Sequence, residues 1–222
     1  SSVLKSGLIC FIFGLFVMFL SKNPKKIINR RDGYLVVVVG WLTMVFSGML
    51  PYVFTNTIDN VPDLIFETMS GYTTTGSSII SDIEALPKSI IFWRSMTHWL
   101  GGMGIIVLAI AILPLLGIGG MQLFSAEVPG SGISGDKIHP RISATAKRLW
   151  LIYFGLTILE TIALSIAGMS FFDALNHSMS NIATGGFSTK NESLAYWNSI
   201  PSVQYIVIFF MILAGTNYLL IY

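Results

Sequence analysis

Residues 63–116 decide the fold, and they read DLIFETMSGYTTTGSSIISDIEALPKSIIFWRSMTHWLGGMGIIVLAIAILPLL. The first part, residues 63–69, has helical character but is far shorter than the about 20 apolar residues that a helix needs to cross a bilayer. Hydroxyl groups and glycines then replace apolar side chains over residues 70–78, and a long apolar segment follows at residues 89–116. A short helix, a polar loop and a returning span together predict a re-entrant element at membrane depth.

The composition agrees with a membrane location. Of the 222 residues, 53% are hydrophobic and only 11% are charged, whereas a soluble domain has roughly 45–50% apolar and 25% charged residues. The sequence therefore predicts an all-α integral membrane protein. A formal net charge of +2 is too small to indicate a nucleic-acid partner, and the single cysteine, Cys10, excludes an intramolecular disulfide framework.

Further apolar runs surround the re-entrant element, at residues 7–20, 34–54, 149–168 and from 199 onward. Basic residues gather between the runs in residues 22–31 and 117–148, which predicts that these two loops are cytoplasmic. Because the chain begins without Met and stops inside an apolar run, we expect it to be a piece of a longer protein.

The re-entrant pattern occurs a second time. A shift of 110 residues gives six identities within sixteen positions, pairing Asp63 with Asp173, Met69 with Met179, Ser70 with Ser180, Thr74 with Thr184, Gly76 with Gly186 and Ser78 with Ser188. Both copies lie between an outward and a returning apolar run. We therefore predict two equivalent re-entrant loops, in which Gly76 corresponds to Gly186.

Irregular backbone inside a membrane is tolerated only where it lines water or ions, because unpaired amide and carbonyl groups are costly in hydrocarbon. Glycine permits positive φ, and carbonyl oxygens that point to one axis can replace the hydration shell of K⁺. The loops contain no formal charge, whereas a calcium or magnesium site would favour carboxylates. The candidate K⁺-binding residues are Thr73, Thr74, Thr75, Gly76, Ser77, Ala183, Thr184, Gly185, Gly186 and Phe187. The alternative is that Gly and Thr only pack a tight turn.

Charged groups inside spans are costly and need partners. We expect Glu67, on the first short helix, to pair with Arg94 on the returning helix and to brace the loop. In the second copy His177 occupies the place of Glu67, and Glu160 on the preceding span is its expected partner.

A run of glycines follows on the same returning helix. Gly101, Gly102 and Gly104 give it a surface without side chains, which favours close helix packing or serves as a hinge for gating.

Four strings carry a resemblance to a known family: SGYTTTG at 70–76, HWLGGMG at 98–104, FSAEVPG at 124–130 and ATGGFST at 183–189. The chain resembles, over nearly its whole length, the Trk/Ktr/HKT superfamily of potassium transporters, and most of all its bacterial TrkH branch. The resemblance implies four covalently joined helix, pore-loop, helix repeats around a central K⁺ pathway, preceded by two extra helices. It places a leading helix and basic loop at 1–31, the first repeat with its cytoplasmic loop at 32–140, and a second repeat, truncated in its last helix, at 141–222.

The same resemblance implies a pore-forming subunit of a potassium uptake system in the bacterial inner membrane, acting as a symporter or a channel. Gly76 matches the potassium-selective pattern of the superfamily. The implied partners are the remaining pore repeats, a second copy in a homodimer, membrane lipids and a cytosolic nucleotide-binding ring of the TrkA type, which is expected to meet residues 127–130 and the basic residues after them. K⁺ is the only metal expected, with no organic cofactor.

Two other classes of protein stay open as alternatives. An intramembrane enzyme would need a nucleophile with a base, or a metal set, and no spacing in the sequence makes one. A non-transporting helical assembly subunit would lack re-entrant loops.

Overall fold

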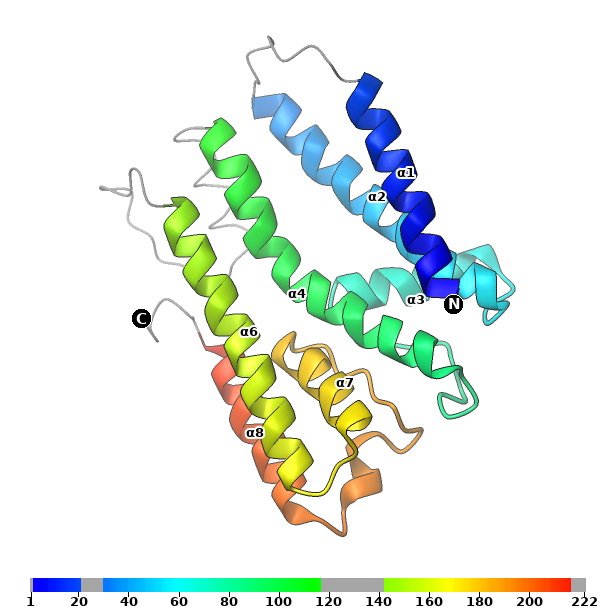
Figure 1. Cartoon of the computed structure of the whole chain (residues 1–222), viewed down its shortest axis with the longest axis vertical. Helices are drawn as coiled ribbons and strands as arrows, with labels where there is room; N and C mark the ends of the chain where they lie inside the picture. Colours follow the sequence, from blue (N-terminus) through cyan, green and yellow to red (C-terminus); the bar gives the residue numbers. More distant parts are fainter. Residues whose placement is uncertain (1, 21–29, 117–141, 217–222) are drawn as a thin grey trace.

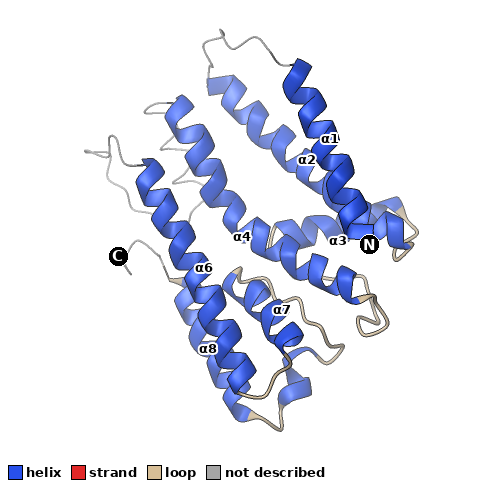
Figure 2. Ribbon diagram, in the orientation of Figure 1, coloured by secondary structure: helices blue, strands red, loops and turns tan. Residues whose placement is uncertain are grey.

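The computed structural model describes residues 2–20, 30–116 and 142–216, and all regular structure within these ranges is helical (Figures 1 and 2). The elements are α1 (Ser2–Leu20), α2 (Arg30–Thr55), α3 (Val61–Tyr72), α4 (Lys88–Leu116), α6 (Ile142–Ile166), α7 (Phe171–Ile182), the 3₁₀ helix η1 (Ser193–Trp197) and α8 (Pro201–Gly215). The predicted all-α fold is confirmed. The predicted ring contact at residues 127–130 lies outside the described residues.

Three helices in the described part of the chain are long and apolar enough to cross a membrane, namely α1 at Val3–Leu20, α2 at Val37–Thr55 and α6 at Leu149–Ile166. The 29 residues of α4 give it a length of about 44 Å, more than a bilayer core of about 30 Å. Large apolar side chains such as Phe11, Phe16 and Leu151 are exposed, as a hydrocarbon environment requires. The chain is a multi-pass membrane protein.

The two short helices, α3 and α7, have 12 residues each, which makes them about 18 Å long and too short to span. A proline in the first turn starts α3, and the Ser170 hydroxyl caps α7 by accepting the amide of Asp173 at 3.2 Å. Both helices run past the predicted boundaries at residues 69 and 179. In α3 the Thr73 amide still donates to the Met69 carbonyl, which continues the helical pattern.

The long helix α4 separates the α1–α2 pair from the group of α6, α7 and α8 (Figure 1). One buried cluster joins α2, α3 and α4 through Met49, Tyr52, Leu64 and Ile90. A second joins α6, α7, η1 and α8 through Leu164, Ala174, Trp197 and Val203. A third, of Met103, Tyr153, Ile182 and Phe210, packs α4 against α6, α7 and α8. Helix α7, in the half of the chain formed by α6–α8, is therefore packed against α4, in the half formed by α1–α4.

The loops that follow α3 and α7 also touch each other away from the helices. The Lys190 ammonium lies 2.8 Å from the Glu84 carboxylate. The Asn191 side chain donates to Asp82 at 3.0 Å and accepts the Ile83 amide at 2.7 Å. The hydrogen bond from Asn191 lowers the pKa of Asp82, and the hydrogen bond to Glu84 raises the pKa of Lys190.

Candidate ion site at two re-entrant loops

The first loop leaves α3 through a tight turn. Thr74 adopts a positive φ of 54° and Gly76 one of 77°. The Thr74 amide donates to the Gly71 carbonyl at 3.1 Å, and the Thr75 amide donates to the Ser70 carbonyl at 3.0 Å. These bonds close the C-terminal end of α3 and turn the following residues away from the helix.

The second loop repeats this geometry at the matched positions. Thr184 has a φ of 55° and Gly186 one of 98°. The Thr184 amide donates to Asn181 and the Gly185 amide to Ser180, both at 2.8 Å. Positive φ is rare outside glycine, so its recurrence at both a threonine and a glycine, 110 residues apart, shows that the two loops are equivalent and that Gly76 corresponds to Gly186.

The two loops meet at their glycines. A β-carbon on Gly76 would overlap the carbonyl oxygen of Gly185, so the two backbones touch with no side chain between them. No backbone amide of a described residue donates a hydrogen bond to the carbonyl oxygens of residues 73–76 or 183–186. Backbone amides of the described residues therefore leave these oxygens unused, and the Gly185 oxygen lies against the backbone of Gly76.

The candidate residues at the ends of the loops differ from the others. The Ser77 carbonyl accepts the Ser70 hydroxyl at 2.6 Å. The Phe187 side chain is buried, its ring stacked on that of His98 with centroids 3.9 Å apart. Both residues thus make contacts within the protein, and Phe187 adds one to α4 that sequence reasoning missed.

Glu67 and Arg94 form an ion pair in the interior. Arg94 Nε lies 2.9 Å from Glu67 Oε1, and both side chains are almost fully buried. Glu67 also accepts the Ser78 hydroxyl at 3.0 Å and the Ile79 amide at 3.0 Å, while Arg94 Nη2 donates to Ser78 at 2.9 Å. The pair thus joins α3, the exit of the loop and α4.

The predicted pairing of His177 with Glu160 is wrong. His177 Nε2 contacts the Ser188 hydroxyl at 3.0 Å and Nδ1 contacts the Asp173 carbonyl at 2.8 Å. Glu160 instead accepts the Asn181 amide at 2.7 Å, one helical turn nearer the loop. Both histidine nitrogens are used by other partners, which leaves none for the carboxylate.

The repeat register could have predicted the partner of His177. The shift of 110 residues that places His177 on Glu67 also places Ser188 on Ser78, the serine that Glu67 contacts.

The glycines of α4 differ from one another. A β-carbon on Gly101 would overlap the Tyr72 carbonyl, and one on Gly102 would lie 2.7 Å from the Tyr153 hydroxyl and 3.1 Å from the β-carbon of Ala183. A β-carbon on Gly104 would meet no described atom within 4 Å. Gly101 and Gly102 therefore let α4 approach the start of each loop.

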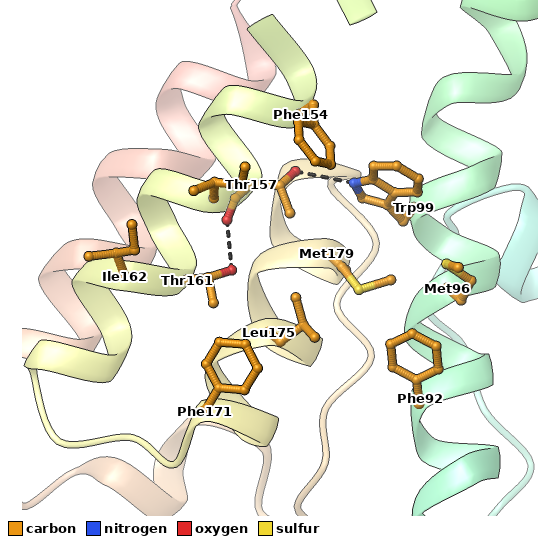
Figure 3. Close-up of a pocket in the computed structure, with 11 residues that line it drawn as sticks. Phe92, Met96, Trp99, Phe154, Thr157, Thr161, Ile162, Phe171, Leu175 and Met179 are labelled. Atoms are coloured by element: carbon orange, nitrogen blue, oxygen red, sulfur yellow. Dashed lines mark hydrogen bonds between the residues drawn. The ribbon is translucent and has the colours of Figure 1, made fainter. Parts of the chain in front are cut away.

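A groove of about 400 Å³ lies between α4 and α6, and Phe171, Leu175 and Met179 of α7 also line it (Figure 3). Phe92, Met96 and Trp99 of α4 form one wall, and Phe154 and Ile162 of α6 face them. The Trp99 indole donates to Thr157 at 3.2 Å, and the Thr161 hydroxyl donates to the Thr157 carbonyl at 2.7 Å. The surface of the groove is apolar, and none of the residues that line it lies in the two loops.

These features define a class, a multi-pass helical membrane protein in which two equivalent re-entrant loops meet through bare backbone. The family model for TrkH, described as a cation transport protein, matches residues 1–222. The chain belongs to the TrkH family.

Individual relatives agree. The chain is 44% identical over 211 residues to the Trk system potassium uptake protein TrkH of Escherichia coli K12, a match that covers 95% of this chain and 43% of the relative. It is 36% identical over 215 residues to TrkG of the same strain, covering 96% of this chain and 44% of the relative.

A solved structure gives the same result. The crystal structure of the potassium transporter TrkH from Vibrio parahaemolyticus aligns with a TM-score of 0.81 and 39% identity, covering 99% of this chain and 43% of that one. The chain therefore spans less than half the length of the relatives it matches.

Proposed function

We propose that the chain forms part of the pore of a bacterial inner-membrane potassium uptake system, and that main-chain oxygens of residues 73–77 and 183–187 hold dehydrated K⁺. The observation that carries this proposal is the contact between the Gly76 turn and the Gly185 carbonyl, together with the carbonyls of residues 73–76 and 183–186, which receive no hydrogen bond from a backbone amide of a described residue. The names of the relatives, potassium uptake proteins, support K⁺ as the transported ion.

Electrostatics favour a cation at this place. α3 and α7 both end where their loops begin, and the C-terminal end of a helix carries a partial charge of about −0.5. No Asp or Glu occurs in residues 70–78 or 180–189. Carbonyl dipoles thus supply the coordination, as suits a monovalent ion that must also leave.

Two loops are two sides of the proposed pore. A β-carbon on Gly186 would meet no described atom within 4 Å, whereas one on Gly76 would overlap the Gly185 carbonyl of the second loop. This leaves the second turn open to a third loop, and we propose that the remaining repeats of the full-length protein complete the ring. The division at residues 32–140 and 141–222 into two repeats is part of this proposal, as are the homodimer and the cytosolic TrkA-type ring.

An enzyme is the weaker interpretation, although one contact resembles a catalytic pair. His98 Nδ1 lies 2.9 Å from the Ser180 hydroxyl. Ser180 is only 1% exposed and already accepts the Gly186 amide at 3.0 Å, so its oxygen has no room for a substrate. The non-transporting assembly subunit is disfavoured because it requires no re-entrant loops.

The test is uptake by the full-length protein in cells that lack other potassium uptake systems. The wild type should restore K⁺ accumulation, and Gly76→Ser should lower the preference for K⁺ over Na⁺, because the new side chain would press on the Gly185 carbonyl from a backbone with φ of 77°. Ser95→Ala, a buried change on α4 whose hydroxyl donates to its own helix, is the control. An unchanged preference in Gly76→Ser would contradict the assignment of the loops.

A further inference from the structure

A histidine on α4 contacts the second loop, which belongs to the other half of the chain. His98 is 0% exposed, and its Nδ1 lies 2.9 Å from the hydroxyl of Ser180 at the end of α7. The same hydroxyl oxygen accepts the backbone amide of Gly186 at 3.0 Å. A continuous hydrogen-bonded path therefore runs from the α4 side chain to the backbone of the loop glycine.

The ring of His98 adds a second contact. It lies parallel to the Phe187 ring, with an interplanar angle of 13° and centroids 3.9 Å apart. The Arg94 guanidinium lies 4.1 Å from the centroid of the same phenyl ring, an arrangement that attracts a cation to the aromatic face. Two residues of α4, one turn apart, thus fix the position of Phe187.

The backbone of the second loop lies directly against the imidazole ring of His98. A β-carbon on Gly185 would overlap the imidazole of His98, although the φ of Gly185 is not positive. Glycine is therefore required at this position by the close approach of His98. The imidazole thus packs against Gly185 and stacks on Phe187. It is also linked to the Gly186 amide through the Ser180 hydroxyl.

The first loop is built differently. Ser70, which matches Ser180, donates to the Ser77 carbonyl of its own loop at 2.6 Å. Within the described residues, only the second loop has its serine bonded to a helix from the other half of the chain. The path of residues 185–187 therefore depends on α4 in a way that residues 75–77 do not.

We propose that His98 is a positioning residue for the second loop, and that it sets the cation preference of this loop across the boundary between the two halves by acting through Ser180 and Phe187. The inference rests on the proposed function. His98 does not contact the ion in this account. It holds the Gly186 amide and the Phe187 ring, so that the carbonyls between them keep their direction.

Two substitutions of His98 separate its hydrogen bond to Ser180 from its stacking on Phe187. His98→Phe keeps an aromatic ring against Phe187 and removes Nδ1, whereas His98→Asn keeps a polar group near the position of Nδ1 and removes the ring. Ser180→Ala removes the hydrogen-bonded path from the other end. Ser95→Ala, buried on the same helix, is the matched control.

Initial uptake rates of K⁺ and Na⁺ are measured for these variants in the full-length protein, as a ratio that does not depend on expression. We expect His98→Phe and Ser180→Ala each to lower K⁺ preference by about fivefold, the effect of one net hydrogen bond. Their double variant should be no worse than either alone, and His98→Asn should recover part of the preference. Wild-type preference in both His98→Phe and Ser180→Ala would overturn the inference.

A second readout separates this inference from the proposed function. Hydrogen exchange of a peptide covering residues 183–187 should be faster in His98→Phe than in the wild type or Ser95→Ala. The reason is that Ser180, which accepts the Gly186 amide, is no longer held in place by His98. Failure of the wild type to accumulate K⁺ would refute the proposed function alone. Unchanged exchange in His98→Phe would refute the positioning role, whatever the transport result.

Discussion

At the scale of single residues, several close contacts between helices and loops depend on glycine, because a β-carbon would not fit at these positions. Gly71 lies inside α3, where alanine would normally be favoured by roughly 0.5–1 kcal/mol. A β-carbon on Gly71 would overlap the Thr97 hydroxyl of α4. The absence of a side chain there lets the two helices approach closely.

We therefore predict that Gly71→Ala destabilises the protein by about 1–3 kcal/mol, the typical cost of overpacking. Gly155→Ala in α6 is the matched control, because a β-carbon there would meet no described atom within 4 Å. The midpoint of thermal unfolding in detergent should fall for the first variant and stay equal or rise for the second. Equal midpoints would contradict the close approach of α3 and α4.

The sequence predicted the loop glycines but not their neighbours. The motif and the repeat predicted Gly76 and Gly186 as equivalent turns, because positive φ and glycine are linked by local sterics. The contact of His98 with Ser180 spans 82 positions and depends on how α4 packs against α7. No local pattern in the sequence encodes such a packing angle.

At the scale of helices, the two halves stabilise equivalent loops with different chemistry. α3 uses the Glu67–Arg94 ion pair, whereas α7 places His177 at the matched position and contacts Ser188. Burying charges is costly, and removing one partner leaves the other uncompensated. The first pore helix should therefore depend strongly on its ion pair.

Arg94→Met should destabilise the full-length protein by about 3–5 kcal/mol, because it leaves Glu67 as an unpaired buried charge. Adding Glu67→Gln to this variant should recover part of the loss. The control is Glu84→Gln, which breaks the exposed pair with Lys190 and should cost at most about 1 kcal/mol. Thermal unfolding is measured for the wild type, Arg94→Met, the double variant Arg94→Met with Glu67→Gln, and Glu84→Gln. A loss of stability in Glu84→Gln as large as that in Arg94→Met would contradict the importance of the buried pair.

The interior pair illustrates what composition and spacing can predict. Glu67 and Arg94 were expected to meet because each is costly alone in a membrane, and the structure joins them. The same rule failed for Glu160 and His177 because hydroxyl, amide and carbonyl groups also satisfy buried polar atoms. Ser188 and Asn181 supply such groups here, and charge alone did not identify them.

At the scale of the whole molecule, the two halves are joined by the third buried cluster, by His98 and by the exposed contacts between Asp82, Glu84, Lys190 and Asn191. The apolar runs of the sequence predicted the helices of each half. It could not predict how closely the halves approach, because that is determined by side chains far apart in the sequence.

The exposed contacts should respond to pH only at its extremes. Because the pKa of Asp82 is lowered in the folded state, its contribution is present above its unfolded pKa of about 3.9 and is lost as the pH falls through the lower folded value. Because the pKa of Lys190 is raised, its contribution is present below about 10.4 and is lost as the pH rises through the higher folded value.

The difference in unfolding midpoint between the wild type and Asp82→Asn should therefore be constant from about pH 5 to 9 and should disappear in strong acid. Asp59→Asn, a change of another exposed acid, gives the baseline. A difference that varies steeply near neutral pH would show that Asp82 is not held by Asn191 in this way.

The most direct measurement of the central claim is the anomalous diffraction of Tl⁺, an analogue of K⁺, in crystals of the full-length protein. We predict a peak bounded by the carbonyl oxygens of residues 73–76 and 183–186, which weakens when excess K⁺ is added. A Tl⁺ peak found only beside carboxylates such as Asp82 or Glu84, with none between the two glycine turns, would contradict the account.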